Sequence, residues 1–232
     1  MSSWRPSTMT EDRLQDFAEK GLLPPKTEHE EPQPEADEIV SFLAFHERAL
    51  GYPAHPFLRG LLNKWEVELQ HLNPNGLLHI AGFITLCEGF LGIDLHANLF
   101  RAFFYGRALS VKGDPELAPV GGFGLQKRAR RSGDYPAYTP ANSNRGWHEE
   151  WFYIRNPVGN PFPSFTGARP MRKDSWTWGR PAAEKERVEI LEKTLWKRVA
   201  EDGLNGSTKM WEYTGLTDPD QVSKTAVPDD DV

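Results

Sequence analysis

Apolar residues at helical spacing predict a cluster of helices between residues 57 and 107. In the first helix, over residues 57–72, leucines and one tryptophan recur every three or four positions, which is typical of a helix with one buried side. The last, over residues 94–107, repeats the pattern with leucine, alanine and phenylalanine. This helical cluster is the strongest pattern in the chain.

The middle helix is predicted over residues 77–92, LLHIAGFITLCEGFLG, which carry most of the apolar weight of this part of the chain. Asn73 is a candidate cap for the free amides of the first turn. Pro74 suits the first helical position, because the missing N–H costs no hydrogen bond there. Gly92 can end the helix, since glycine readily adopts the left-handed conformation.

Three shorter segments predict β-strands. Residues 39–46 suit a buried strand, although their periodicity allows a short helix nearly as well. A second strand is predicted around residues 122–127. A third is predicted over residues 149–155, where apolar side chains on both faces indicate full burial. Pro157 ends this strand because it has no N–H to donate to a neighbour.

The two ends of the chain have a different character. A helix is predicted within residues 8–23, which begin with candidate threonine caps. Residues 24–37 are rich in Pro and Glu and lack apolar residues, so we expect a disordered linker. Residues 182–202 carry a clear apolar stripe and predict another helix. The acidic residues 204–232 are expected to form a loosely ordered tail.

Together these elements predict an α+β fold, in which the central helical cluster packs on a small mixed or antiparallel sheet. The three predicted strands would form that sheet, and the helix of residues 182–202 would close one side. The folded unit would span residues 38–203, between an N-terminal region, residues 1–37, and the C-terminal tail. The pattern predicts no strand order.

Composition and charge narrow the classes of protein. The 232 residues include 33 acidic and 27 basic ones, a formal net charge of −6, so any nucleic-acid binding requires a local basic patch. Cys87 is the single cysteine, which excludes an internal disulfide and a cysteine-based zinc site and suits a reducing compartment. Because no apolar run reaches the roughly 20 residues of a spanning helix, we expect an intracellular protein, in the nucleus or cytoplasm, with no membrane partner.

The apolar helix contains three groups that can bind metals or act in catalysis: His79, Cys87 and Glu88. Successive helical residues turn by about 100°, which places Glu88 almost opposite His79 and Cys87 at the edge of the apolar stripe. Donors that diverge in this way cannot bind one metal ion. We therefore interpret His79 as a core histidine and Cys87 as a small apolar residue, and we expect no cofactor.

One local basic run lies in QKRARRSG, residues 126–133. Cations bind phosphates and aromatic rings stack on bases, so this run and a tyrosine after it are candidates for contact with RNA or DNA. The candidate residues are Lys127, Arg128, Arg130, Arg131 and Tyr135. The same run is compatible with a nuclear-import signal or with a solvated loop.

The segment RGWHEEWFY combines an imidazole with two carboxylates. If it is a strand, His148 and Glu150 share one face, which is a fragment of an acid–base or metal site. With Glu149 and a distant acid such as Asp174, these residues define the hypothesis of a metal-dependent nuclease or transposase. A structural role for the same residues is the simpler interpretation.

Several segments together resemble a family of plant proteins. They are DEIVSFLAFHERALGYPAHPFLRGLL, LQHLNPNGLLHIAGFITLCEGFLGIDLHANLFRAFF, GGFGLQKR, SNRGWHEEWFYIRNP, DSWTWG and the ending TGLTDPDQVSKTAVPDD. From about Trp4 to its C-terminus, the chain is similar to the family called "putative gypsy-type transposon" or "transposase (putative) gypsy type". The resemblance implies a retroelement origin, a gag-like N-terminal portion of a polyprotein, and a transposon-type domain over residues 38–203. It implies no catalytic residues.

The leading hypothesis is therefore a non-enzymatic protein of transposable-element origin, with a role in assembly or nucleoprotein interaction. Its expected partners are RNA or DNA, bound through the basic run, and further copies of itself. The alternatives are the metal-dependent enzyme and an inactive relic open reading frame. Because family members often continue into coiled coils, we expect a fragment or a shortened copy.

Overall fold

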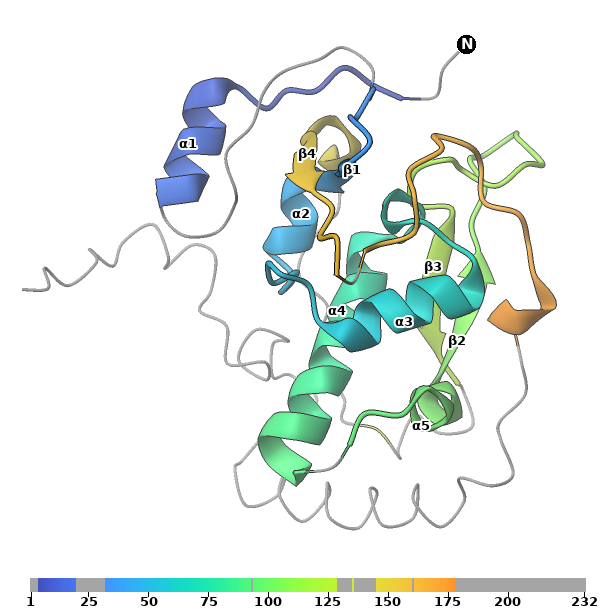
Figure 1. The fold of residues 1–232 in the computed structure, drawn as a ribbon. Coiled ribbons are helices and arrows are strands. Elements are labelled where there is room, and N and C mark those ends of the chain that lie inside the picture. The colour runs from blue at the N-terminus through green and yellow to red at the C-terminus, as the bar shows by residue number, and fades with distance from the viewer. Residues whose placement is uncertain are drawn as a thin grey trace, which may run out of the picture.

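The computed structural model describes residues 4–19, 32–92, 94–128, 135, 145–159 and 161–177 (Figure 1). It confirms the predicted α+β class. The helices are α1 (Glu11–Glu19), α2 (Leu43–His46), α3 (Pro56–Trp65), α4 (Pro74–Ile84) and α5 (Ala97–Phe103), with a π-helix η2 (Thr85–Leu91) and short 3₁₀ turns η1 (Leu69–His71), η4 (Trp147–Glu149) and η5 (Asp174–Trp176). The strands are β1 (Glu38–Phe42), β2 (Phe104–Ala108), β3 (Phe123–Lys127) and β4 (Trp151–Arg155).

The strands of the described residues form two separate antiparallel sheets of two strands each. β1 pairs with β4, so that Phe42 lies opposite Trp151, and β2 pairs with β3, so that Ala108 lies opposite Phe123. The prediction of one sheet was wrong, because it missed β2 and joined β3 to the other two strands. The apolar pattern locates a strand but does not select its partner.

The first strand and the helix after it share one apolar segment. Every residue of β1 is buried, and α2 begins directly after it, where the amide of Leu43 donates to the carbonyl of Glu150. Residues 39–46 are therefore a strand in their first part and a helix in their second. The prediction of a strand throughout was half right, and the short helix that periodicity allowed accounts for the remainder.

Local capping signals set the ends of the central helices. Pro74 is the first residue of α4, and the Oδ1 of Asn73 accepts a hydrogen bond from the amide of Gly76 at 2.7 Å, as predicted. Helix α3 ends at Trp65, since the next residue, Glu66, adopts a left-handed backbone with φ of 53°. The helix predicted to continue to residue 72 therefore stops earlier.

The segment after α4 continues as the π-helix η2, whose hydrogen bonds span five residues instead of four. Gly92 ends it with φ of 61°, which confirms the predicted stop. Helix α5 is shorter than predicted, because the chain becomes β2 at Phe104. Pairing with β3 overrides the helical pattern that extended to residue 107, a case of tertiary contacts outweighing local preference.

One continuous hydrophobic core, with many aromatic rings, joins both sheets. The rings of Phe42 and Trp147 lie 4.8 Å apart beneath β1, while Trp65 of α3 lies 5.0 Å from Phe123 of β3. Trp176 of η5 packs edge-on against Phe123 at 4.7 Å and donates its indole N–H to the carbonyl of Trp65. Helices α3 and α4 lie between the two sheets and contribute leucines and an isoleucine to this core (Figure 1).

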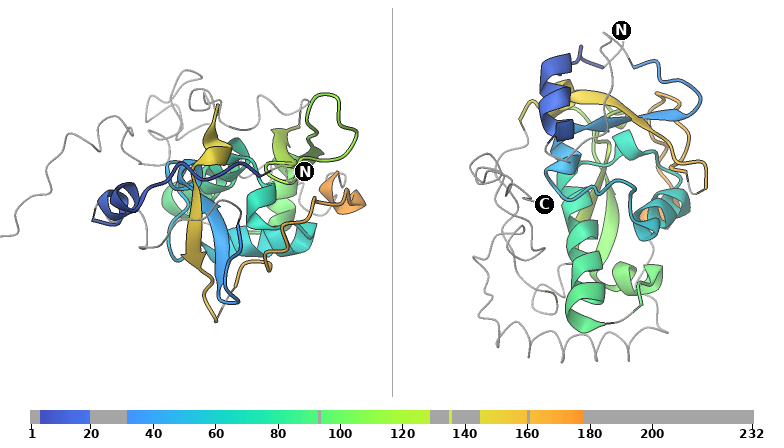
Figure 2. Two further views of the ribbon diagram at one scale, coloured as in Figure 1. Left: turned by 90° about the horizontal axis from the view of Figure 1, so that it is seen from above. Right: turned by 60° about the vertical axis from the view of Figure 1, so that its left-hand side comes forward.

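The N-terminal segment lies along the β1–β4 sheet (Figure 2). The amide of Thr8 donates to the carbonyl of Glu149, and the indole N–H of Trp151 donates to the carbonyl of Arg5. The amide of Gln33 donates to the hydroxyl of Tyr153 at 2.8 Å. Residues 32–37 of the predicted linker therefore adjoin this sheet, whereas residues 24–31 lie outside the described residues.

The helix predicted over residues 182–202 and the tail of residues 204–232 also lie outside the described residues. The predicted boundaries at residues 38 and 203 therefore stay predictions. None of the described helices is both long and apolar enough to cross a membrane.

Candidate nucleic-acid interface

The outer face of the β2–β3 sheet carries polar side chains from both strands. Successive strand residues point to opposite faces, so Phe104 is buried while Tyr105 is half-buried and Arg107 is exposed. Tyr105 lies opposite Gln126 of β3, and its hydroxyl donates to the Gln126 Oε1 at 2.9 Å. This face therefore presents an aromatic ring and a guanidinium from alternate positions of one strand.

Arg128 extends the same face just beyond the end of β3. Its backbone amide donates to the carbonyl of Phe103, and its side-chain Nε donates to the carbonyl of Arg101 at 2.8 Å. The Cζ of Arg128 lies 5.5 Å from the centroid of the Tyr105 ring, within reach of a cation–π contact. The backbone around α5 therefore fixes this arginine beside the tyrosine.

Lys127, the first residue of the predicted basic run, points to the other face of the sheet. It lies opposite Phe104, and burial lowers the pKa of its ammonium. The imidazole of His79 packs 5.1 Å from the Phe104 ring on this inner face. Burial, and to a lesser extent the charge of Lys127, lowers the pKa of His79 to about 4. Lys127 is thus the last residue of the strand predicted around residues 122–127 and is turned toward the helices, although the sequence analysis named it as a candidate for contact with RNA or DNA.

Tyr135 occupies the core. It is 1% exposed, and its ring lies 5.2 Å from Phe103 and 5.0 Å from Phe104. Its ring is therefore inside the protein and not at the surface, where a base could stack. The other two predicted residues, Arg130 and Arg131, lie outside the described residues. The aromatic ring that accompanies the cations on this surface is Tyr105.

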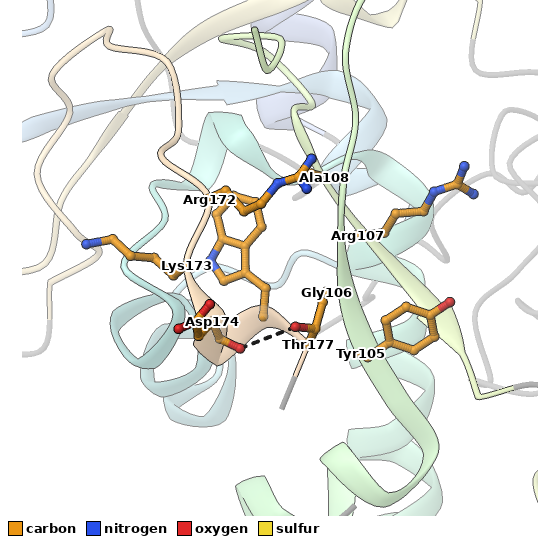
Figure 3. A pocket seen from close by; sticks show the side chains of 9 residues that line it. Tyr105, Gly106, Arg107, Ala108, Arg172, Lys173, Asp174 and Thr177 are labelled. Carbon is orange, nitrogen blue, oxygen red and sulfur yellow. Dashed lines mark hydrogen bonds between the residues drawn. The ribbon is translucent and has the colours of Figure 1, made fainter. Parts of the chain in front are cut away.

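A pocket of about 290 Å³ lies between β2 and the segment of residues 172–177 (Figure 3). Trp176 contributes to its wall and is 2% exposed. A Cβ atom on Gly106 would come within 2.4 Å of the Phe123 ring and 3.0 Å of the Trp176 Cβ. Only glycine fits at position 106, because β2 and the segment of residues 172–177 approach each other closely there.

The pocket is lined by more cations than anions. Figure 3 shows Arg172 and Asp174 on one side of β2 and Arg107 on the other. Lys173 is neutralised by Glu66, whose Oε2 lies 2.8 Å from the lysine Nζ. Arg172 and Asp174 therefore remain to face a ligand on one side of β2, and Arg107 on the other.

Sequence reasoning missed Arg107 and Arg172. The residues FYGRA were read as the end of a helix, although their alternation of buried and polar positions is a strand signal that could have located Arg107. No local signal could have located Arg172, since it approaches β2 only through the fold. The segment of residues 172–177 is distant from β2 in the sequence.

The carboxylates of the metal-enzyme hypothesis are engaged elsewhere. Residues Trp147–Glu149 form a 3₁₀ turn before β4, so His148 and Glu150 do not alternate on a strand as predicted. Glu149 pairs with Arg5, and Glu150 pairs with Arg13 at 2.8 Å. Within the described part of the chain, no three His, Cys, Asp or Glu side chains gather closely enough to bind a metal ion.

The groups of the apolar helix are also separated. Cys87 is fully buried, and burial, followed by the nearby charge of Glu88, raises the pKa of its thiol to about 12. Glu88 is half exposed and lies 3.3 Å from the Nε2 of His55. Cys87 is therefore a small core residue, as predicted, because a thiol that stays protonated is a poor nucleophile and metal ligand.

The family comparison bears on the central part of this architecture. Residues 39–108 match the family model described as "Putative gypsy type transposon". The resemblance drawn from the residues is confirmed over this segment, which is less than half of the 232 residues. The gypsy-type match runs from β1 through β2 and so includes Tyr105 and Arg107, whereas β3 and the 172–177 segment lie beyond it. No curated protein and no solved structure matches the chain significantly.

Proposed function

We propose that this protein is a non-enzymatic, gag-like protein of transposable-element origin that binds RNA or DNA through the outer face of the β2–β3 sheet. The position of Tyr105 between Arg107 and Arg128 carries the proposal. An aromatic ring beside cations is the usual arrangement for contacts with single nucleic-acid strands, since the ring stacks on a base while the cations attract phosphates. In the sequence, Arg130 and Arg131 follow shortly after Arg128.

The net charge of −6 limits how such binding can work. The protein as a whole repels a polyanion, so affinity must come from few phosphate contacts and must be sensitive to salt. Each neutralised phosphate on a single strand changes the slope of log K against log salt by about 0.7. A small negative slope is therefore expected, in contrast to the steep slope of a highly basic binder.

Fluorescence anisotropy with labelled oligonucleotides, over salt from about 50 to 200 mM, tests the proposal. Replacing Arg128 by Ala should weaken binding and make the salt slope shallower by about 0.7. Tyr105→Ala should weaken binding by about 1–3 kcal/mol if a base stacks on the ring. Tyr105→Phe keeps the ring and loses only the hydrogen bond to Gln126, so it should bind nearly as the wild type does.

Arg155→Ala is the matched control, because Arg155 is an exposed arginine on the other sheet, with an ion pair of 3.8 Å to Asp37. It removes the same charge at a different place and should change binding little. Equal weakening by Arg128→Ala and Arg155→Ala would show that only net charge matters. Wild-type protein that binds no oligonucleotide at low salt would overturn the proposal.

The same proposal includes self-association, which the gag-like resemblance implies. Size-exclusion chromatography with light scattering, with and without RNA, measures the mass of the protein and of any complex. A mass of one chain under both conditions would contradict assembly. A mass that increases only with RNA would indicate that the nucleic acid organises the copies.

A further inference from the structure

The pocket lies along the edge of β2 that does not pair with β3. In an antiparallel pair, backbone groups of alternate residues point toward the partner strand and away from it. The hydrogen bonds from Leu109 to Gly122 and from Arg128 to Phe103 fix this alternation. Hence the N–H groups of Gly106 and Ala108 point away from β3, toward the side where residues 172–177 lie.

Two arginines adjoin these backbone amides. Neither Arg107 nor Arg172 forms a hydrogen bond or ion pair with another residue in the described part of the chain, and both side chains are exposed. Backbone N–H groups beside guanidinium groups are suited to phosphate oxygens, which accept bidentate hydrogen bonds from arginine. The pocket therefore has the donors of an anion site, and Asp174 is the only negatively charged side chain among the described residues that line it.

The geometry points to a phosphate subsite for a single-stranded nucleic acid, which continues the binding face around the edge of β2. This inference rests on the proposed function and specifies the form of its ligand. A strand whose base stacks on Tyr105 would pass Arg107 on the outer face, turn around the edge of β2 and place a neighbouring phosphate beside Arg172 and the backbone amides of Gly106 and Ala108. Trp176, which contributes to the wall of the subsite, is buried and donates its indole N–H to the Trp65 carbonyl.

The size of the pocket favours a single strand over a duplex. About 290 Å³ lies at the small end of ligand sites, which span roughly 300–1,000 Å³, so it admits a phosphate and its sugar. A duplex holds its phosphates on a stiff cylinder and cannot turn around the edge of one strand, whereas a single strand can.

Asp174 favours a nucleic acid over an acidic peptide. Its carboxylate repels a phosphate as it repels a second carboxylate, but it can accept hydrogen bonds from a ribose hydroxyl or a base amino group, which lie next to the phosphates of a nucleic acid and are absent from an acidic side chain. The 2′-hydroxyl is present in RNA and absent from DNA. Single-stranded DNA and RNA share the phosphate chemistry that the arginines recognise, so both belong in the test.

The experiment measures anisotropy of labelled single-stranded DNA, single-stranded RNA and the corresponding duplex with the full chain. Arg172→Ala should weaken single-strand binding about tenfold, the value of one lost charge-assisted hydrogen-bonded contact. It should weaken duplex binding no more than Arg155→Ala does. Asp174→Ala removes the acceptor, and its loss of charge acts equally on DNA and RNA. A loss of affinity for RNA relative to DNA would identify the 2′-hydroxyl as the partner of Asp174, whereas equal changes on both would identify the base.

The outcomes separate this inference from the proposed function. If Arg128→Ala weakens binding and Arg172→Ala does not, the outer face binds nucleic acid and the phosphate subsite is overturned. Equal loss on the duplex and the single strand in Arg172→Ala would also overturn it. Absence of any wild-type binding would overturn both proposals together. An acidic peptide that competes as well as the oligonucleotide would replace the nucleic acid as the ligand of the pocket.

Discussion

The two sheets have the same size and pairing but different surroundings. All residues of β1 are buried, and all residues of β4 except the last one are buried, because the N-terminal segment and α2 lie over them. In β2 the burial alternates, and in β3 it decreases along the strand, so that Arg107 and Gln126 are exposed. A pair of five-residue antiparallel strands can thus lie in the core or at the surface. Whether it is buried depends on the segments that cover it.

Charge follows the same division. Next to the β1–β4 sheet, Glu149 and Glu150 are paired with Arg5 and Arg13, so the charges of this region are largely satisfied internally. On and beside the β2–β3 sheet, Arg107 and Arg172 carry charges that no described residue neutralises. In the first region the charged side chains stabilise the fold, whereas in the second the arginines are available to bind a ligand.

The largest expected loss of stability comes from a substitution in the covered β1–β4 sheet. Trp151 is 1% exposed, packs 6.2 Å from the Trp4 ring and donates its indole N–H to the carbonyl of Arg5. Trp151→Ala should lower the free energy of unfolding by about 3–5 kcal/mol, because it leaves a cavity and an unsatisfied carbonyl. Chemical denaturation measures this. Tyr105→Ala on the accessible sheet should cost about 1 kcal/mol or less, and equal losses in the two variants would contradict the contrast.

A smaller effect is expected where the accessible sheet meets the core. Gly106→Ala would place a Cβ at 2.4 Å from the Phe123 ring, and overpacking of this kind costs about 1–3 kcal/mol. The matched control is Gly60→Ala in α3, where no atom lies within 4 Å of the new Cβ. That control should stabilise by about 1 kcal/mol, since alanine favours helix over glycine. Thermal melts compare the two, and a stable Gly106→Ala protein would refute the close approach.

The inner face of the accessible sheet should respond to acid. Burial lowers the folded-state pKa of His79 from 6.5 to about 4. Between these values the unfolded chain binds a proton that the folded chain does not, so stability is complete above pH 6.5 and falls as the pH decreases toward 4. The loss at about pH 5 should be about 1–2 kcal/mol. Denaturation of wild type and His79→Gln at about pH 7 and 5 isolates this effect, and identical pH dependence would contradict it.

The smallest expected effect on stability belongs to the pocket. Arg172 is exposed and forms no ion pair with a described residue, so Arg172→Ala should change the free energy of unfolding by less than about 0.5 kcal/mol. Binding should weaken in the same variant. A large loss of stability would make Arg172 a structural residue and would remove the distinction between the two regions at this position.

Short-range patterns in the sequence were sufficient to predict several elements. Asn73 and Pro74 predicted the start of α4, because a cap acts within one turn of the helix. The apolar run WFYI predicted β4 as a fully buried strand, and FGLQ predicted β3. Cys87 was recognisable as a core residue, since its neighbours in the helix are apolar.

Only the tertiary structure decided which segments cover one another. The pairing of β1 with β4, the inward direction of Lys127 and the burial of Tyr135 depend on segments that are distant in sequence. The same is true of Arg172 beside β2. Helix capping and apolar periodicity act over a few residues, so a short stretch of sequence is enough to predict them. Burial and charge neutralisation depend on packing between distant segments, which no local pattern contains.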